Sequence, residues 1–328
     1  MTMPLPGWAR SLAEETAALR LRLAARRPSP PPAADPGEVR VTVRDPAAVD
    51  LDRRMPLCKL CELEDWRDPR RIAVIRRCLP YLSVAAADFP RGMEHRKHWE
   101  FAQLLAGIEE LAALREDGLV LSVGAGHEEP VYELTNRARW VFATDVYGGG
   151  RFRSLEGDGR MLVDPDRFAR LPYRRDRLVV QWMDGLDLHH EDGTFDVVFS
   201  LSSIEHFGGL HAARSALREM ARVVRPGGFV AVATECVVNG VAGHRGRGLA
   251  LFTPGEIGEL AGACPDLELV EPIDFGISPA TMGKVKPLSE ALLEARRGVT
   301  DYPAIVFEHR GRQFTSVFLH LRKRGGNR

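Results

Sequence analysis

Two glycines and an aspartate stand where a sheet could present them to a ligand that contains a nucleoside. The apolar run 119–123 leads into Gly124 and Gly126. Glycines at such a point let the chain turn sharply and let a ligand lie against bare backbone. The next apolar run, 140–144, ends at Asp145, whose carboxylate could accept hydrogen bonds from both hydroxyls of a ribose. A solvated loop aspartate is the alternative interpretation.

The residues that follow the glycine turn distinguish two nucleoside cofactors. A dinucleotide-binding fingerprint requires a third glycine at position 129, where this chain has Glu129 directly after Glu128. Two carboxylates there would repel a pyrophosphate at the start of a helix. S-adenosylmethionine (SAM) has no phosphate, and its methionine end carries an amino group, so acidic residues are tolerable. The pattern therefore favours SAM over NAD.

Two further strand ends add candidate cofactor contacts. Asp184 follows the apolar run 178–182 and could accept a hydrogen bond from the adenine amino group, with Met183 packing on the ring. As an alternative, Asp184 starts an Asp-Gly turn and Met183 fills the core. Ser200, at the end of the run 196–200, completes the predicted cofactor set.

The middle of the chain resembles the class I SAM-dependent methyltransferases, of the type 11 kind. The resemblance rests on five segments together: GAG at 124–126, TD at 144–145, MDG at 183–185, FDVVFSLSSIEHF at 195–207 and EMARVVRPGG at 219–228. It implies a Rossmann-like α/β fold with a seven-stranded, mostly parallel sheet and helices on both faces. It also implies cofactor roles for the two glycines and the two aspartates. Within this family, the chain resembles a subgroup that is linked to bacterial saccharide or natural-product pathways.

Within this resemblance, His206 and Glu205 are the candidate catalytic residues, because the family places residues that face the acceptor beyond the fourth strand. Methyl transfer from a sulfonium is an in-line displacement, which requires alignment of the acceptor. A hydroxyl acceptor must also lose its proton, and a histidine titrates near neutral pH. Glu205 could orient His206 or touch the cofactor. A structural role for His206 at the following helix is the alternative, and further pocket candidates are His127, Glu235 and Asn239.

Two groups of possible metal ligands do not lead to a predicted metal site. Cys58 and Cys61 have the spacing of a zinc-binding pair, with Cys78 and His95 or His98 further along. No second close pair follows, so reduced core or surface cysteines are the preferred interpretation. The run 189–192, His-His-Glu-Asp, precedes the fourth strand and is interpreted as a solvated loop.

Alternating strands and helices must position these residues. The apolar pattern predicts strands at 120–123, 141–144, 178–182, 196–200 and 229–234, which favours a parallel sheet covered on both faces. A helix over 98–114 should precede the first of them. Later strands are expected at 267–273 and 314–321, and 304–308 could pair with the latter through a polar turn.

Prolines and composition divide the chain into four expected parts. An amphipathic N-terminal helix (1–27) is followed by a proline-rich linker (28–37), because prolines cannot continue a helix. An N-terminal lobe (38–94), with a possible short strand at 38–43 and a helix at 68–79, precedes the methyltransferase domain (95–328).

Composition excludes several classes of protein. The 328 residues include 45 basic and 45 acidic side chains, so the formal net charge is zero and no whole-protein field attracts nucleic acid or anionic membranes. Charged residues interrupt the N-terminal region, so the apolar core of a signal peptide does not form there. No stretch reaches the roughly 20 apolar residues of a membrane span. We expect a cytoplasmic protein without nucleic-acid or membrane partners; the sequence does not determine its oligomeric state.

The expected function is transfer of a methyl group from SAM to a hydroxyl, or an amine, of a small molecule or saccharide. A SAM-binding scaffold or regulatory subunit without turnover would keep the same glycines and aspartates, so only turnover separates these two functions. A nucleic-acid methyltransferase would need a basic face and usually an Asn or Asp-Pro-Pro-aromatic element after the fourth strand. This chain has Ser-Ser-Ile-Glu-His there.

Overall fold

The computed structural model describes residues 38–44, 54–85, 89–149, 153, 156–241 and 248–325. Gly37–Arg328 forms one compact unit. The predicted N-terminal helix (1–27) and proline-rich linker (28–37) lie outside the described residues.

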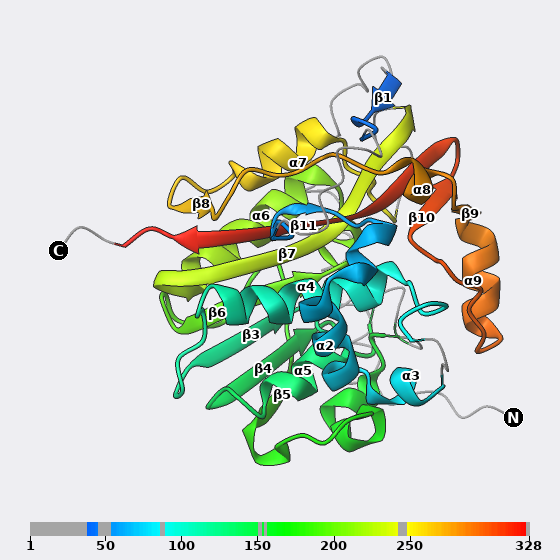
Figure 1. The fold of residues 1–328 in the computed structure, drawn as a ribbon. Helices are drawn as coiled ribbons and strands as arrows, with labels where there is room; N and C mark the ends of the chain where they lie inside the picture. The colour runs from blue at the N-terminus through cyan, green and yellow to red at the C-terminus, as the bar shows by residue number, and fades with distance from the viewer. Residues whose placement is uncertain are drawn as a thin grey trace, which may run out of the picture. The chain divides into compact units, whose positions relative to one another are not determined.

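One sheet runs through this unit, and its first five strands in spatial order are parallel (Figure 1). The order is β5-β4-β3-β6-β7-β11-β10-β9. The parallel strands are β3 (Leu119–Val123), β4 (Trp140–Asp145), β5 (Leu178–Trp182), β6 (Phe195–Leu201) and β7 (Val224–Val241). Each predicted parallel strand is therefore present, and the predicted α/β class is confirmed.

Strand β11 (Arg312–Lys323) runs antiparallel to β7 and shares its other edge among three short strands. These are β10 (Val306–His309), β2 (Lys59–Leu60) and β8 (Leu267–Leu269), all antiparallel to β11. Strand β9 (Val285–Pro287) extends the sheet beyond β10, and β1 (Glu38–Arg40) pairs with the end of β7. The hairpin expected between 304–308 and 314–321 is confirmed as β10 and β11.

The predicted count of seven strands is wrong, since the described residues form an eleven-stranded sheet. Strand β7 has 18 residues and β11 has 12. Their length leaves room for short partners from distant parts of the chain. The predicted N-terminal lobe supplies β1 and β2 to this sheet.

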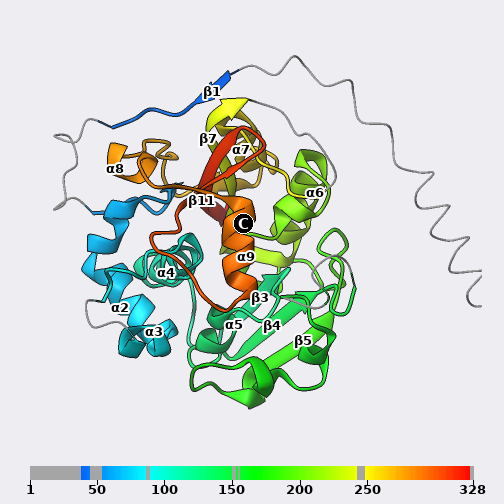
Figure 2. The same ribbon diagram turned by 90° about the vertical axis from the view of Figure 1, so that its right-hand side faces the viewer.

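Helices cover both faces of the sheet, with α4 on one face and α6 on the other (Figure 2). The α-helices are α2 (Pro69–Cys78), α3 (Pro80–Ala85), α4 (Arg96–Glu110), α5 (Glu129–Leu134), α6 (Leu210–Val223), α7 (Pro254–Ala261), α8 (Pro279–Met282) and α9 (Leu288–Arg296). Short 3-10 helices are η2 (Leu63–Arg67), η3 (Gly159–Leu162), η4 (Pro165–Phe168), η5 (Arg175–Arg177) and η6 (Ile204–His206). No helix in this described part is both long and apolar enough to cross a membrane.

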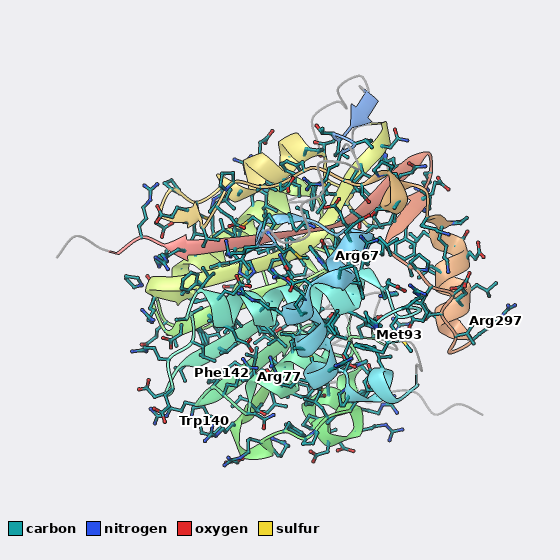
Figure 3. The ribbon with its side chains drawn as sticks, in the orientation of Figure 1. Arg67, Arg77, Met93, Trp140, Phe142 and Arg297 are labelled. Atoms are coloured by element: carbon teal, nitrogen blue, oxygen red, sulfur yellow. The ribbon has the colours of Figure 1, made fainter. Side chains whose placement is uncertain are left out.

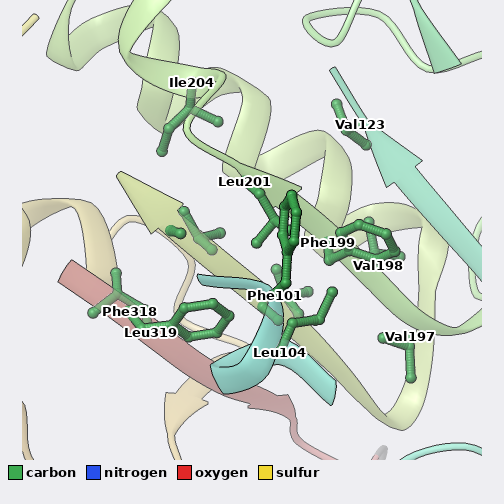
Figure 4. Packing of buried hydrophobic residues seen from close by; sticks show 14 of the residues in the cluster. Phe101, Leu104, Val123, Val197, Val198, Phe199, Leu201, Ile204, Phe318 and Leu319 are labelled. Atoms are coloured by element: carbon green, nitrogen blue, oxygen red, sulfur yellow. The ribbon is translucent and has the colours of Figure 1, made fainter. Parts of the chain in front are cut away.

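Helix α4 is buried on nearly every side, because α2 packs on it from outside the sheet. Its side chains Phe101 and Leu104 lie between β6 and β11, where Phe199 and Phe318 complete the packing (Figure 4). Burying such side chains stabilises each by roughly 1.5–3 kcal/mol relative to exposure. Helix α4 is thereby fixed against the middle of the sheet.

The strand order creates a switch point between β3 and β6. The chain places β4 and β5 on one side of β3, and β6 and β7 on the other. Ligands of open α/β sheets bind at such a point, outside the carboxyl ends of the strands. Helix α9 lies beyond these carboxyl ends (Figures 1 and 2). In Figure 3, Trp140 lies at the left, where β4 starts, and Arg297, after α9, lies at the right of the molecule.

Candidate functional site

The glycine turn after β3 requires glycine at both predicted positions. Gly124 has φ +65° and Gly126 φ +49°, in the left-handed region that other residues rarely adopt. A Cβ atom on Gly124 would lie 2.6 Å from the Cβ of Ser203, and one on Gly126 would lie 3.1 Å from the backbone oxygen of Glu156. Neighbouring protein atoms closely approach the backbone at both positions, whereas the contact with a cofactor stays a prediction.

Asp145, the last residue of β4, is bonded to the glycine turn. Its Oδ2 accepts a hydrogen bond from the N–H of Gly126 at 2.9 Å, and its Oδ1 accepts from the N–H of Val146 at 2.7 Å. Burial raises the pKa of this carboxyl above its usual range, although both hydrogen bonds lower it. Each carboxylate oxygen has a second lone pair available for a ligand.

Tyr147 holds the same turn from its other side. This contact is not predicted from the sequence. Its buried hydroxyl donates to the backbone oxygen of Gly126 at 2.6 Å. A tyrosine two residues after Asp145 was the available signal, yet nothing in its local sequence indicates that its hydroxyl reaches back across the turn. Gly126 is therefore fixed through both its N–H and its C=O.

Met183 and Asp184 lie just beyond β5. Met183 is buried, and its backbone N–H donates to the backbone oxygen of Asp145 at 3.0 Å. Asp184 is exposed, and its Oδ1 accepts from the N–H of Leu186 at 2.9 Å. The turn and core roles of these residues are thus observed, whereas their contacts with adenine stay a prediction.

The segment after β6 lies directly over the glycine turn. The Ser203 hydroxyl donates to the backbone oxygen of Gly124 at 2.7 Å. A Cβ on Gly185 would lie 2.7 Å from the ring of Phe207. This segment carries both candidate catalytic residues, so the fold brings the predicted catalytic and cofactor elements together.

His206 is half-buried at the end of η6, and its backbone N–H donates to the backbone oxygen of Ser203 at 2.9 Å.

Ser200 is fully buried within β6, and its Oγ has no hydrogen-bond partner among the described residues. Among the further pocket candidates, the ring of His127 stacks on Phe168, with centroids 4.7 Å apart. The Asn239 side chain donates a hydrogen bond to Gln313, its neighbour on β11, at 3.0 Å.

Glu205 lies in a buried polar environment that joins it to β7. Its Oε2 accepts from the Thr234 hydroxyl at 2.9 Å. Burial and the neighbouring carboxyl of Glu235 raise the pKa of Glu205 to about 8. Glu235 itself forms an ion pair with Arg96 at 2.7 Å, from the first turn of α4.

The same network continues to the glycine turn through α4. Glu100 pairs with Arg96 at 3.2 Å and with Lys97 at 3.0 Å. Lys97 also pairs with Glu128 at 2.5 Å, two residues after Gly126. Burial raises the pKa of Glu128 to about 8 in spite of this lysine. Sequence reasoning missed Arg96, Lys97 and Glu100, because their partners are distant in the chain.

The possible metal ligands are not brought together. All five cysteines are buried free thiols, and the Cys58 sulfur accepts the backbone N–H of His320 at 3.3 Å. His189 is exposed beside Asp187. Within the described ranges, no group of three or more His, Cys, Asp or Glu side chains is arranged to hold a metal ion.

The methyltransferase-domain family matches residues 121–232. The match includes the glycine turn, Asp145, the turn after β5 and the whole η6 segment. Residues 121–232 are a class I SAM-dependent methyltransferase domain. Within this methyltransferase domain, the cofactor and catalytic roles of individual residues stay predictions.

A curated relative is similar over part of the chain. The 27-O-demethylrifamycin SV methyltransferase of Amycolatopsis mediterranei (strain S699) is 29% identical over 130 residues, which is 40% of this chain and 43% of that protein. The chain thus matches less than half of the length of this relative.

Solved structures resemble the fold at low identity. The [4+2]-cyclase SpnF has a TM-score of 0.45 and 16% identity, covering 78% of this chain and 97% of its own. A geranyl diphosphate methyltransferase in complex with SAM has a TM-score of 0.44 and 14% identity, covering 87% and 98%. The geranyl diphosphate C-methyltransferase of Streptomyces coelicolor A3(2) has a TM-score of 0.42 and 14% identity, covering 73% and 87%.

Proposed function

We propose that this protein transfers the methyl group of SAM to a hydroxyl of a small molecule or saccharide, with an amine as the second acceptor type. The observation that carries the proposal is the family match over residues 121–232, which coincides with the segment that assembles the glycine turn, Asp145 and η6. These three elements meet at the switch point of the sheet, where ligands of open α/β sheets bind.

The glycine turn fits the proposed cofactor. Glycine is required at 124 and 126 because a Cβ would meet Ser203 or Glu156, and the backbone of this turn would lie against the cofactor. Asp145 would accept hydrogen bonds from the ribose hydroxyls, and Met183, Asp184 and Ser200 complete the proposed set. When bound, SAM supplies an electrophilic methyl group on a sulfonium.

The chain's own residues would orient the acceptor and remove its proton. We assign His206 as the general base, its imidazole accepting the hydroxyl proton as the new oxygen–carbon bond forms. Glu205 lies beside it in sequence, and its bond to the Thr234 hydroxyl fixes the η6 segment to β7. We therefore assign Glu205 a positioning role.

Binding and turnover test the proposal separately. Calorimetry should give binding of SAM and of its product S-adenosylhomocysteine (SAH), but not of NAD. A mass-spectrometric screen of sugar nucleotides, glycans and phenolic metabolites should then find a gain of one methyl group. NAD binding without SAM binding would overturn the cofactor assignment. SAM binding without methylation of any hydroxyl or amine in the screen would favour the scaffold function instead.

A further inference from the structure

The polar network between α4, η6 and β7 occupies the switch point itself. The Lys97 ammonium donates to the backbone oxygen of Leu201, the last residue of β6, at 3.0 Å. It also pairs with Glu128, which follows the glycine turn at the end of β3. One side chain thus bridges the carboxyl ends of the two strands between which a ligand of this fold binds.

This network contains more carboxyl groups than cations. Its carboxyl groups are Glu100, Glu128, Glu205 and Glu235, and its cations are Arg96 and Lys97. The side chains of Glu100 and Glu235 are 0% and 2% exposed, and the residue Glu205 is 0% exposed. At this depth a carboxylate needs a positive partner or a proton.

Two carboxyl oxygens of the network lack a partner. Glu205 Oε1 and Glu235 Oε2 are buried, and neither has a hydrogen-bond donor in the part of the chain that the structure describes. Leaving such oxygens unpaired is costly, so they require a proton or a cation from elsewhere. The raised pKa of Glu205 and of Glu128, each about 8, agrees with stored protons at neutral pH.

The other charged groups around these carboxyls do not remove the surplus. Glu129 raises the pKa of Glu128 further, and Glu100 raises those of Glu205 and Glu235. Burial lowers the pKa of His95, at the start of α4, well below its usual range, which leaves it neutral. The titratable and charged groups facing the network come from four elements. They are His95, Arg96, Lys97 and Glu100 from α4 and its cap, Glu128 and Glu129 from the start of α5, Glu205 from η6 and Glu235 from β7.

We propose that this acid-rich network is the counter-charge for the cationic centre of bound SAM, and that SAM binding displaces a proton from it. SAH is a thioether without the sulfonium charge, so it should displace less. The network would then favour the reactant over the product, which limits product inhibition. This inference rests on the proposed function, since it assumes that both ligands bind.

Calorimetry of the full chain between pH 6 and 7 tests the proposal without measuring activity. At these values a ligand's own amino group stays largely protonated, and so do carboxyls that titrate near pH 8. Titrations in phosphate and in imidazole, which both buffer in this range but differ in their enthalpy of protonation, give the number of protons released. SAM should release a larger fraction of a proton than SAH. By linkage, the ratio of SAM to SAH affinity should rise with pH by a slope equal to that difference.

Variants locate the effect. Glu235→Gln and Glu205→Gln should each lower the preference for SAM over SAH by roughly three- to tenfold, because each removes one nearby negative charge. Glu259→Gln on α7, at an exposed ion pair with Arg214 on α6, should leave the preference unchanged. Equal proton release by SAM and SAH in the wild-type protein would overturn the proposal even if a variant fails to fold. Failure of both ligands to bind would instead overturn the proposed function.

Discussion

The carboxylate of Asp145 stabilises the backbone of the glycine turn as well as offering acceptors to a ribose. One of its two hydrogen bonds comes from Gly126 and the other from Val146. Its removal should therefore affect both ligand affinity and local stability. The Asp145 side chain thus also builds the surface on which the ligand would lie.

Asp145→Ala should weaken SAM binding by roughly 1–3 kcal/mol, because hydroxyl groups of the ligand would lose their accepting partner. The variant should still fold. Tyr147→Phe is a matched control, since it removes only the bond to the Gly126 oxygen and no proposed ligand contact. Calorimetry should show a much smaller loss for Tyr147→Phe; equal losses would mean that Asp145 acts only through the shape of the turn.

His206→Ala should lower turnover by roughly 10²–10⁴-fold while leaving SAM affinity nearly intact, as expected for a general base. Turnover of the wild-type protein should rise with pH through a pKa near neutrality, and the variant should lose that limb. The measurements are a pH–rate profile with an acceptor found by the screen and calorimetry with SAM. A variant that loses SAM affinity instead would make His206 a cofactor contact or a structural residue.

At the scale of elements, the glycine turn and the η6 segment form one packed unit. Gly124→Ala should destabilise the protein by roughly 1–3 kcal/mol and abolish tight SAM binding, since the residue has φ +65° and the new methyl would meet Ser203. Gly258→Ala, inside α7 with open space around it, should stabilise by about 0.5–1 kcal/mol. Thermal unfolding and calorimetry of both variants would separate a general glycine effect from this specific contact.

The contact between α4 and β11 makes stability dependent on pH. The ring of His320 lies where a Cβ on Gly107 would be 2.2 Å away, and its Nε2 is 3.2 Å from the backbone oxygen of Gln103. Burial lowers the pKa of His320 to about 3. The unfolded chain binds this proton near pH 6.5, so the stabilisation is fully present above that pH and is lost as pH falls towards 3.

We therefore expect His320→Gln to flatten the acid limb of a stability profile measured by urea unfolding between pH 4 and 7. The wild-type protein should lose more stability than the variant across this interval. Glu268→Gln, at an exposed ion pair with Arg324, is the control and should keep the wild-type slope. Parallel profiles for wild type and His320→Gln would contradict the buried neutral histidine.

The sequence predicts the parallel strands well, because short apolar runs bounded by turn residues form them. Strand β5 was predicted with its observed bounds, whereas β7 extends on both sides of the predicted 229–234. Its extension contains the polar residues Glu235 and Asn239, whose side chains pair with Arg96 and Gln313. The two-residue strand β2 has no local signal at all.

Separation along the chain limits prediction of the site in the same way. The glycine turn and Asp145 are close in sequence and carry a recognisable pattern. The network around Arg96 joins α4 to β7, so only the tertiary fold brings Arg96 and Glu235 together. No periodicity in the sequence could indicate an ion pair between such distant residues.

At the scale of the whole molecule, the predicted lobe (38–94) and the predicted domain (95–328) share one core. Leu60, Trp66 and Val74 are buried in the same cluster as residues of α4 and β6, and β2 pairs with β11. A chain that starts at residue 95 would expose these surfaces. We expect it to be insoluble or unfolded, by circular dichroism and size-exclusion chromatography, whereas a chain that starts at residue 37 should fold. A soluble, folded 95–328 fragment would support the lobe as a separate domain.

Strand β11 also has a consequence for how the protein is made. Its partners β2, β7, β8 and β10 all precede it in the sequence. During synthesis each of these partner strands therefore leaves the ribosome before β11, which completes its hydrogen bonds. Leu60 on β2, for example, cannot pair with Val317 until β11 has been made. Such nascent chains expose unpaired strand edges and apolar surface, which favour aggregation. Production in cells should therefore depend on chaperones that hold the growing chain until residues 312–323 have emerged.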